Sequence, residues 1–252
     1  MASLSEIVQY CNTRLDVTRY ADYCPNGLQV DGRPEVKSLV TGVTASQALI
    51  DQAVEQGADA ILVHHGYFWK GESPTLTGMK YRRIRALIQH DISLIAYHLP
   101  LDGHPELGNN IALANKLGLT NCVPCGEGMP DSILFTAELP GALSAAEAAE
   151  LMSEKLGRQP LVVEAGEHPV RRIGLCTGGA QGYIGRAAEL GLDAFLTGEA
   201  SEQTTHIARE EGVHFFAAGH HATERYGVQA LGAELASVFE IEHRFIDVDN
   251  PV

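Results

Sequence analysis

The chain has few basic residues. Its 252 residues include 18 Lys and Arg against 32 Asp and Glu, which gives a formal net charge of −14. A surface that wraps nucleic acid normally carries a basic excess to neutralise phosphates, so this charge argues against nucleic acid as a partner. A basic cluster in "MKYRRIRALIQH" has a spacing more typical of a solvated helix face than of a phosphate-binding patch; its members are Lys80, Arg82, Arg83 and Arg85.

Cysteine and long apolar runs are also scarce. Five scattered cysteines, an odd number, do not form a disulfide framework and predict a reducing compartment. No apolar run approaches the length of a transmembrane helix. The opening "MASLSEIVQYCNTRLD" is acidic and polar where a secretory signal needs a basic flank and an apolar core. We therefore expect a cytoplasmic protein without a membrane-spanning segment.

Several common catalytic and nucleotide-binding motifs are missing. The sequence has no G-x-S-x-G elbow, no G-x-G-x-x-G fingerprint and no glycine-rich loop ending in Lys-Ser/Thr. "CTGGAQG" at 176–182 predicts a tight strand-to-helix turn, whose N–H groups could still receive an anionic substrate. Cys122 and Cys125 form a single C-x-x-C in a Gly/Pro loop, without the second pair that zinc needs, and we assign it no function.

The residues that are present favour alternating helices and strands around a sizeable core, because 45% of the chain is hydrophobic. "SLSEIVQYCNTRL" at 3–15 predicts an amphipathic helix, with Ser3 or Ser5 as its cap. A β-α-β unit follows, and connections of this length predict parallel strands. Its parts are a strand at 37–43, a helix at 46–57 and a strand at 59–63.

A similar unit recurs in the second half. "KSLVTGVTASQALIDQAVEQGADAILVHHG" (37–66) aligns without a gap over "RRIGLCTGGAQGYIGRAAELGLDAFLTGEA" (171–200), and Gly57 meets Gly191. We interpret this as an internal duplication; the alternative is two unrelated units that share only what all such units share. Further segments are strands at 92–98, 131–139, 160–166 and 213–221 and a helix at 144–157, opened by a capping box from Ser144 to Glu147.

These patterns predict an α/β fold with mainly parallel sheets, built from two repeats. We assign the repeats to residues 1–126 and 127–252, with the boundary in the Pro- and Gly-rich "TNCVPCGEGMPD". Because no long linker separates them, we expect the two repeats to pack together.

Histidines and carboxylates follow three of the predicted strands. In a parallel sheet, ligands gather beyond the carboxyl ends of the strands, and we expect these three ends to lie in one sheet. Adjacent side chains on a strand point in different directions, so one His-His pair can serve two ions. Residues four apart on a helix share a face and can close on one centre. The groups are His64 with His65, His98 with Asp102, and His220 and His221 with Glu224.

A histidine at a strand end is more often a hydrogen-bonding group than a ligand. We expect that role for the remaining six, His90, His104, His168, His206, His214 and His243. The convergence of imidazole and carboxylate at three strand ends instead indicates a dinuclear metal centre, because carboxylates can bridge two cations. Such ligands suit Fe, Mn, Zn, Ni or Mg and do not choose among them.

Long segments of the chain resemble one known family. They are "YCPNGLQV", "GVTASQALIDQAVEQGADAILVHHGYFWKGE", "YHLPLDGHPELGNN", "LTGEASEQ" and "AAGHHATERYG". They are similar to the Nif-three-like dinuclear metal proteins of the YbgI type, also called GTP cyclohydrolase 1 type 2 homologues. The likeness extends to "FIDVDNP" near the end of the chain. It implies intertwined α/β repeats with the metal site between them, and ring-shaped homohexamers (toroids) whose paired metals line an internal cavity.

The resemblance also implies roles for individual residues. It implies that the metal ligands are His64, His65, Asp102, His220 and Glu224. It implies a supporting or proton-transfer role for His98. The large insertion that some family members carry between the halves is missing from this sequence, and any function of that insertion should be missing too.

Three functions fit these expectations. The first is a metal-dependent hydrolase for a small nucleotide-like substrate such as GTP, in which two divalent ions activate water, His98 shuttles a proton and Lys70 or a glycine turn holds phosphate. The second is a ring-forming metal-binding scaffold or interaction protein without turnover. The third is a metal-dependent oxidase, because imidazole and carboxylate also suit iron.

Overall fold

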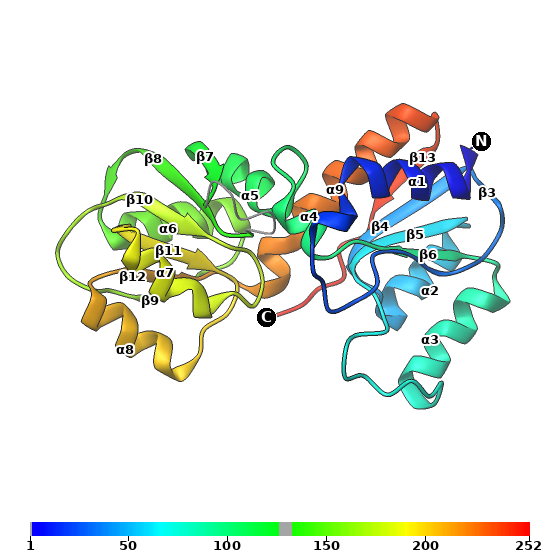
Figure 1. Cartoon of the computed structure of the whole chain (residues 1–252), viewed down its shortest axis with the longest axis horizontal. Coiled ribbons are helices and arrows are strands. Elements are labelled where there is room, and N and C mark those ends of the chain that lie inside the picture. Colours follow the sequence, from blue (N-terminus) through cyan, green and yellow to red (C-terminus); the bar gives the residue numbers. More distant parts are fainter. Residues whose placement is uncertain (1, 126–132) are drawn as a thin grey trace. The chain divides into compact units, whose positions relative to one another are not determined.

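The computed structural model describes residues 2–125 and 133–252, which form two compact units (Figure 1). The first unit comprises the residues up to Leu101 together with Gly227–Asp249, and the second runs from Asp102 to Tyr226 and includes Asn250–Val252. The boundary predicted at 126/127 lies outside the described residues. The assignment of the chain to repeats 1–126 and 127–252 therefore stays a prediction.

The first unit is built on a five-stranded sheet with strand order β13-β4-β5-β6-β2. The first four of these strands pair in parallel, and β2 joins the edge antiparallel to β6. The strands are β13 (Glu242–Phe245), β4 (Ser38–Thr44), β5 (Ala60–His65), β6 (Ser93–Ala96) and β2 (Gly27–Val30), and a separate pair joins β1 (Ala2–Ser3) to β3 (Glu35–Val36).

Helices lie against both faces of this sheet. Leu49 and Ile50 of α2 and Leu87 of α3 are fully buried in one core cluster with the sheet. Figure 1 shows α1 on the opposite face from α2 and α3, and its Ile7 and Cys11 are fully buried. The helices are α1 (Leu4–Arg14), α2 (Gln47–Glu55), α3 (Gly78–Gln89) and the part of α9 (His220–Phe239) that begins at Gly227, with the short turn η1 (Val17–Arg19) after α1.

The second unit is built on a six-stranded mixed sheet with strand order β7-β8-β10-β11-β12-β9. Among its described strands, β10, β11 and β12 pair in parallel, and the strands outside them pair antiparallel. The strands are β7 (Thr120–Pro124), β8 (Phe135–Leu143), β10 (Val170–Leu175), β11 (Ala194–Thr197), β12 (His214–Ala217) and β9 (Leu161–Val163).

Two core clusters flank the sheet of the second unit. One joins α5 and α6 to the sheet through residues such as Leu113 and Met152. The other joins α7 and α8 through Ile184 and Ala208. The elements are α5 (Asn109–Leu117), α6 (Ala145–Leu156), η2 (Gln181–Tyr183), α7 (Ile184–Glu189) and α8 (Glu202–Glu211), while α4 (Leu99–Gly103) spans the boundary between the units.

The predicted α/β class is confirmed, but the prediction that three ligand-bearing strand ends share one sheet is wrong. Strands β5 and β6 belong to the five-stranded sheet, whereas β12 belongs to the six-stranded one. The physical reason is that each β-α-β connection pairs its own two strands, so β4 pairs with β5 and β10 with β11, and each pair starts a sheet of its own.

The two β-α-β units match in their hydrogen bonds as well as in sequence. Asp59 accepts hydrogen bonds from the backbone N–H groups of Lys37 and Ser38 where β4 begins. Asp193, which aligns with Asp59, accepts from the equivalent N–H groups of Arg171 and Arg172. The aligned glycines that end the two helices both have positive φ; they are Gly57 (68°) and Gly191 (61°). These shared details support the interpretation of an internal duplication.

Local predictions were right in most details. The capping box is present, since Ser144 accepts from the Glu147 N–H and Glu147 accepts from the Ser144 N–H. Ser3 is the cap residue of α1 but makes no side-chain cap bond, because its hydroxyl pairs with Ser5. In the described part of the chain, no helix combines the length and apolar character needed to cross a bilayer.

Candidate metal centre

Three histidines of the first unit converge at the ends of β5 and β6. His64 is fully buried and His65 half-buried, as expected for side chains that alternate along a strand. Strand β5 extends through both, rather than ending before them as predicted. His98 follows β6, and one potential ligand atom from each of the three rings lies within 4.8 Å of the others. The three rings therefore form one compact group.

Each of these rings is oriented through its Nδ1 atom. His64 Nδ1 donates to the carbonyl of Tyr97 at 2.9 Å, because a carbonyl can only accept. His65 Nδ1 pairs with the Thr44 hydroxyl at 3.1 Å. Metal-binding histidines almost always hold their second nitrogen in this way, which fixes the ring and leaves Nε2 as the ligand atom.

His98 is held by a buried carboxylate. Its Nδ1 lies 2.9 Å from Asp22 Oδ1, and its backbone N–H donates to Asn26. Burial raises the pKa of Asp22, but hydrogen bonds from His98, Asn26 and the Leu99 N–H outweigh it and lower that pKa to about 2. Asp22 is therefore an anion at neutral pH and accepts the Nδ1 proton. The other nitrogen of His98, Nε2, is the atom that can exchange a proton.

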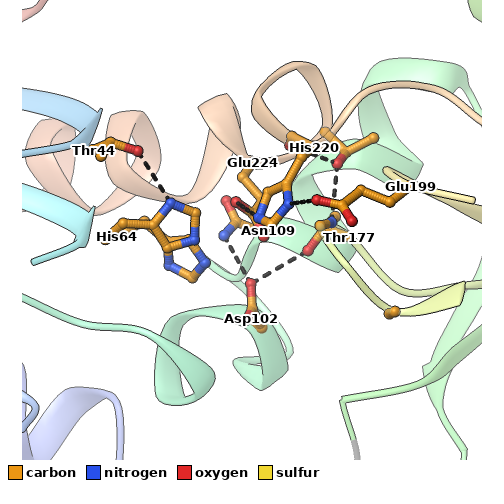
Figure 2. Close-up of polar contacts among 12 residues, drawn as sticks. Thr44, His64, Asp102, Asn109, Thr177, Glu199, His220 and Glu224 are labelled. Carbon is orange, nitrogen blue, oxygen red and sulfur yellow. Dashed lines mark hydrogen bonds and ion pairs between the residues drawn. The ribbon is translucent and has the colours of Figure 1, made fainter. Parts of the chain in front are cut away.

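In the second unit, His220 and Glu224 lie one turn apart at the start of α9. His220 Nε2 is 3.2 Å from Glu224 Oε2, and Glu224 is almost fully buried. On the other side of the ring, His220 Nδ1 lies 2.6 Å from Glu199 Oε1 (Figure 2). Burial lowers the pKa of His220, but the hydrogen bonds and charges of Glu224 and Glu199 outweigh it and raise that pKa to about 9.

Asp102 is a second buried carboxylate of this unit. Its Oδ1 accepts from Asn109 Nδ2 at 2.9 Å and from Thr177 Oγ1 at 3.3 Å (Figure 2). The Asn110 side chain links the backbone of Asp102 to that of Thr177, since it donates to the Asp102 carbonyl and accepts from the Thr177 N–H. The Asn109 and Thr177 donors fix the orientation of this carboxylate. Buried carboxylates are normally paired with cations or bound to metal ions, so Asp102 suits a metal ligand.

The glycine turn after β10 makes room for these side chains. A Cβ atom on Gly178 would lie 2.0 Å from Glu224 Oε1 and 3.1 Å from His220 Nε2. The predicted strand-to-helix turn is thus present, but its suggested use as an anion receptor is not supported for two of its N–H groups. Gly178 N–H donates to Thr223 Oγ1 and Ala180 N–H donates to Thr197 Oγ1.

Most other histidines have structural roles, as predicted. His104 accepts from two backbone N–H groups, His214 accepts from the Ala165 N–H, and His243 pairs with Thr41. His206 pairs with Glu202 on the exposed face of α8.

Burial raises the pKa of the Cys122 thiol to about 11 and also raises the pKa of Cys125. An activated redox pair has lowered pKa values instead.

Sequence reasoning missed two residues that hold the rings, Asp22 and Glu199. For Glu199 a signal was present: the internal alignment places it under His65, in the repeat whose strand otherwise lacks a ligand. For Asp22 there was no comparable signal, because it lies in a loop and reaches His98 across 76 positions of sequence. A long-range contact of this kind has no periodicity to reveal it.

The chain is thus an α/β protein with a group of histidines in one unit and a carboxylate and histidine group in the other. The sequence model of the Duf34/NIF3 (NGG1p interacting factor 3) family matches residues 2–251, and the chain belongs to this family. It is 59% identical over 249 residues to a GTP cyclohydrolase 1 type 2 homolog of Pseudomonas aeruginosa, covering 99% of this chain and 98% of that protein.

Two further relatives agree with this assignment. A GTP cyclohydrolase 1 type 2 homolog of Haemophilus influenzae is 55% identical over 247 residues, with 98% of each chain covered. A solved structure of protein ybgI is 50% identical and matches with a TM-score of 0.95 over all of both chains. The family resemblance seen in the sequence motifs, and the α/β fold it implied, are therefore confirmed.

Proposed function

We propose that this protein is a hydrolase that depends on two divalent metal ions and acts on a small nucleotide-like substrate. The observation that carries the proposal is the way the imidazoles are held. His64, His98 and His220 each hold Nδ1 against an oxygen atom, which orients the ring as in metal-binding histidines. The names of the close relatives make GTP the first substrate to test.

The donor set fits two hard or borderline divalent ions. The proposed ligands are His64, His65, Asp102, His220 and Glu224, which offer three imidazoles and two carboxylates. When held there, such ions would supply a water molecule of lowered pKa and polarise the bond under attack.

The remaining steps fall to groups of the chain itself. Asp22 holds the Nδ1 proton of His98, so His98 Nε2 can take a proton from the attacking water and return it to the leaving atom. Asn109 and Thr177 keep the Asp102 carboxylate in one orientation. With GTP, water would add to the imidazole ring of guanine and open it.

The test is turnover by the full-length chain loaded in turn with Mn²⁺, Zn²⁺ or Fe²⁺. GTP and a panel of nucleotides and phosphoesters are incubated with it, and products are separated and weighed by mass spectrometry. Ring opening of GTP adds the mass of one water molecule. If no member of the panel is consumed with any of these metals, the hydrolase proposal fails and the scaffold function gains. Oxygen-dependent turnover would favour the oxidase.

Matched histidine variants separate the roles. His98→Gln should abolish most turnover while metal affinity stays near that of the wild type, because His98 acts on the proton. His64→Ala should lose both. His206→Ala is the control, since this exposed histidine pairs only with Glu202 of its own helix among the contacts described and should change neither. Equal loss of metal affinity in His98→Gln would make His98 a ligand instead.

The proposed assembly is a ring-shaped homohexamer. Native mass spectrometry of the full-length chain measures the number of subunits directly. Removal of the metal with a chelator then distinguishes an ion that serves catalysis from an ion that stabilises the hexamer. A hexamer that stays intact without metal, while turnover stops, agrees with the hydrolase.

A further inference from the structure

Two aromatic rings of the first unit stand beside His98. Tyr23 lies in the loop before β2 and Trp69 in the loop after β5, so their proximity comes from the fold. The ring centroids of Tyr23 and Trp69 lie 5.1 and 5.0 Å from that of His98. They lie 5.8 Å from each other, and Trp69 also lies 6.0 Å from His65. We call this pair of rings the aromatic wall.

The wall is open to solvent, although the histidine beside it is buried. Tyr23 is 52% exposed and Trp69 is partly exposed, whereas His98 is only 7% exposed. A large ring that serves only the core would be expected to bury most of its area. A face of ring carbon exposed beside His98 instead suits contact with a second molecule.

The wall is also held in place by its surroundings. Trp69 Nε1–H donates to the Gly66 carbonyl at 3.1 Å, and the Lys70 N–H donates to the Tyr23 carbonyl at 2.7 Å, which ties the two loops together. Glu72 accepts from the N–H groups of both Phe68 and Trp69. A stacking surface that is already ordered loses little freedom when a ligand binds.

Backbone strain marks the same loop. Phe68 has a φ of 67°, in the left-handed region that bulky residues rarely adopt. Such a conformation persists only where the surroundings fix it, and it is concentrated at ligand sites and active sites. Here it lies directly before Trp69 and therefore helps to set the position of that ring.

We infer that the aromatic wall binds the planar heteroaromatic ring of the substrate by stacking and presents that ring to His98. This inference rests on the proposed function and narrows its substrate to molecules that carry such a ring, for example a purine. Stacking accepts any flat π system, so the wall would select for a heterocycle over a sugar or a simple phosphoester.

The structure offers its own reporter, because Trp69 is the single tryptophan of the chain. The full-length protein is titrated with guanosine, and with ribose as the ligand that lacks a ring system, while the fluorescence of Trp69 is recorded. We expect saturable quenching by guanosine and none by ribose. Absence of any guanosine binding, by fluorescence and by calorimetry, would overturn the inference.

Variants test the contribution of each ring by calorimetry. Tyr23→Leu and Trp69→Leu should each weaken guanosine binding roughly 5- to 150-fold, the range that follows from base stacking on one aromatic side chain. Trp69→Phe, which keeps a smaller ring, should lose less. Tyr81→Leu is the matched control, because Tyr81 is a similarly exposed tyrosine on α3. This variant should bind guanosine as the wild type does.

The outcomes distinguish this inference from the proposed function. Binding of guanosine that depends on both rings, without turnover of any nucleotide, keeps the inference and removes the hydrolase. Turnover with an unchanged KM in Tyr23→Leu and Trp69→Leu keeps the hydrolase and overturns the inference. If these variants change the mass of the assembly and leave guanosine binding unchanged, the wall is an interface between copies and the inference also fails. Circular dichroism confirms that each variant is folded.

Discussion

Replacement of Gly178 by alanine should separate metal binding from folding. Gly178 has a φ of 68° in the turn after β10. A Cβ atom there would lie 2.0 Å from Glu224 Oε1 and 3.1 Å from His220 Nε2. Both are ends of side chains that can turn away, so the fold can accommodate the methyl group. The two proposed ligands cannot keep their present positions when it does.

The magnitudes follow from these two effects. The left-handed conformation costs roughly 1–2 kcal/mol for a residue with a Cβ atom. In a chain of this size each kcal/mol lowers the melting temperature by about 2–4 °C. Loss of groups that orient a ligand lowers metal affinity roughly 10- to 100-fold. Displacement of Glu224 itself should therefore cost at least that much.

Gly212→Ala is the matched control. Gly212 ends α8 with a φ of 66°, and among the described residues a Cβ atom there would meet nothing within 4 Å. Both variants should lose similar stability in thermal unfolding, while calorimetry with Mn²⁺ should show weak binding only for Gly178→Ala. Wild-type affinity in Gly178→Ala would refute the assignment of Glu224 as a ligand. If Gly178→Ala loses much more stability than Gly212→Ala, the added methyl group disturbs the fold and not only the proposed ligands.

Three further predictions concern side chains that hold other groups. Glu199→Gln should weaken metal binding at His220 roughly 10- to 100-fold in calorimetry, because it removes the carboxylate on Nδ1, while Glu202→Gln on the exposed start of α8 should not. Ser144→Ala should lower the free energy of unfolding by about 1 kcal/mol in urea, as expected for loss of a cap. The capping bonds lower the pKa of Glu147, so the ionised Glu147 contributes to stability at neutral pH, and this contribution should be lost as the pH falls through the lowered pKa. If the stability of α6 does not change in acid, the prediction is contradicted.

The regular elements of the chain were predictable because they depend on neighbours in sequence. Apolar residues at helical spacing and a Ser at the start defined α6, and Gly57 ended α2 at the position expected. The duplication was also visible, since aligned Asp59 and Asp193 make the same bonds. The prediction of a single sheet failed because sequence pattern gives strands and connections but not which sheet each strand joins.

The candidate metal-binding side chains could likewise be found from the sequence, but the residues that orient them could not. Histidines after apolar runs marked His64 and His98 as candidates, because strand ends collect ligands in α/β folds. Their orientation depends on Tyr97 and Asp22, and that of His220 on Glu199. Each of these contacts joins separate elements of one unit and follows from how those elements pack.

The sequence by itself determined the family, the α/β class and the residue types that can bind metal, because periodicity, caps and long motifs are local properties of a chain. Only the tertiary structure decided that Gly178 leaves space for Glu224, that Asp22 holds His98, and that Tyr23 meets Trp69. Those contacts depend on the pairing of strands and on where each loop leaves its sheet, and no local pattern encodes such distances.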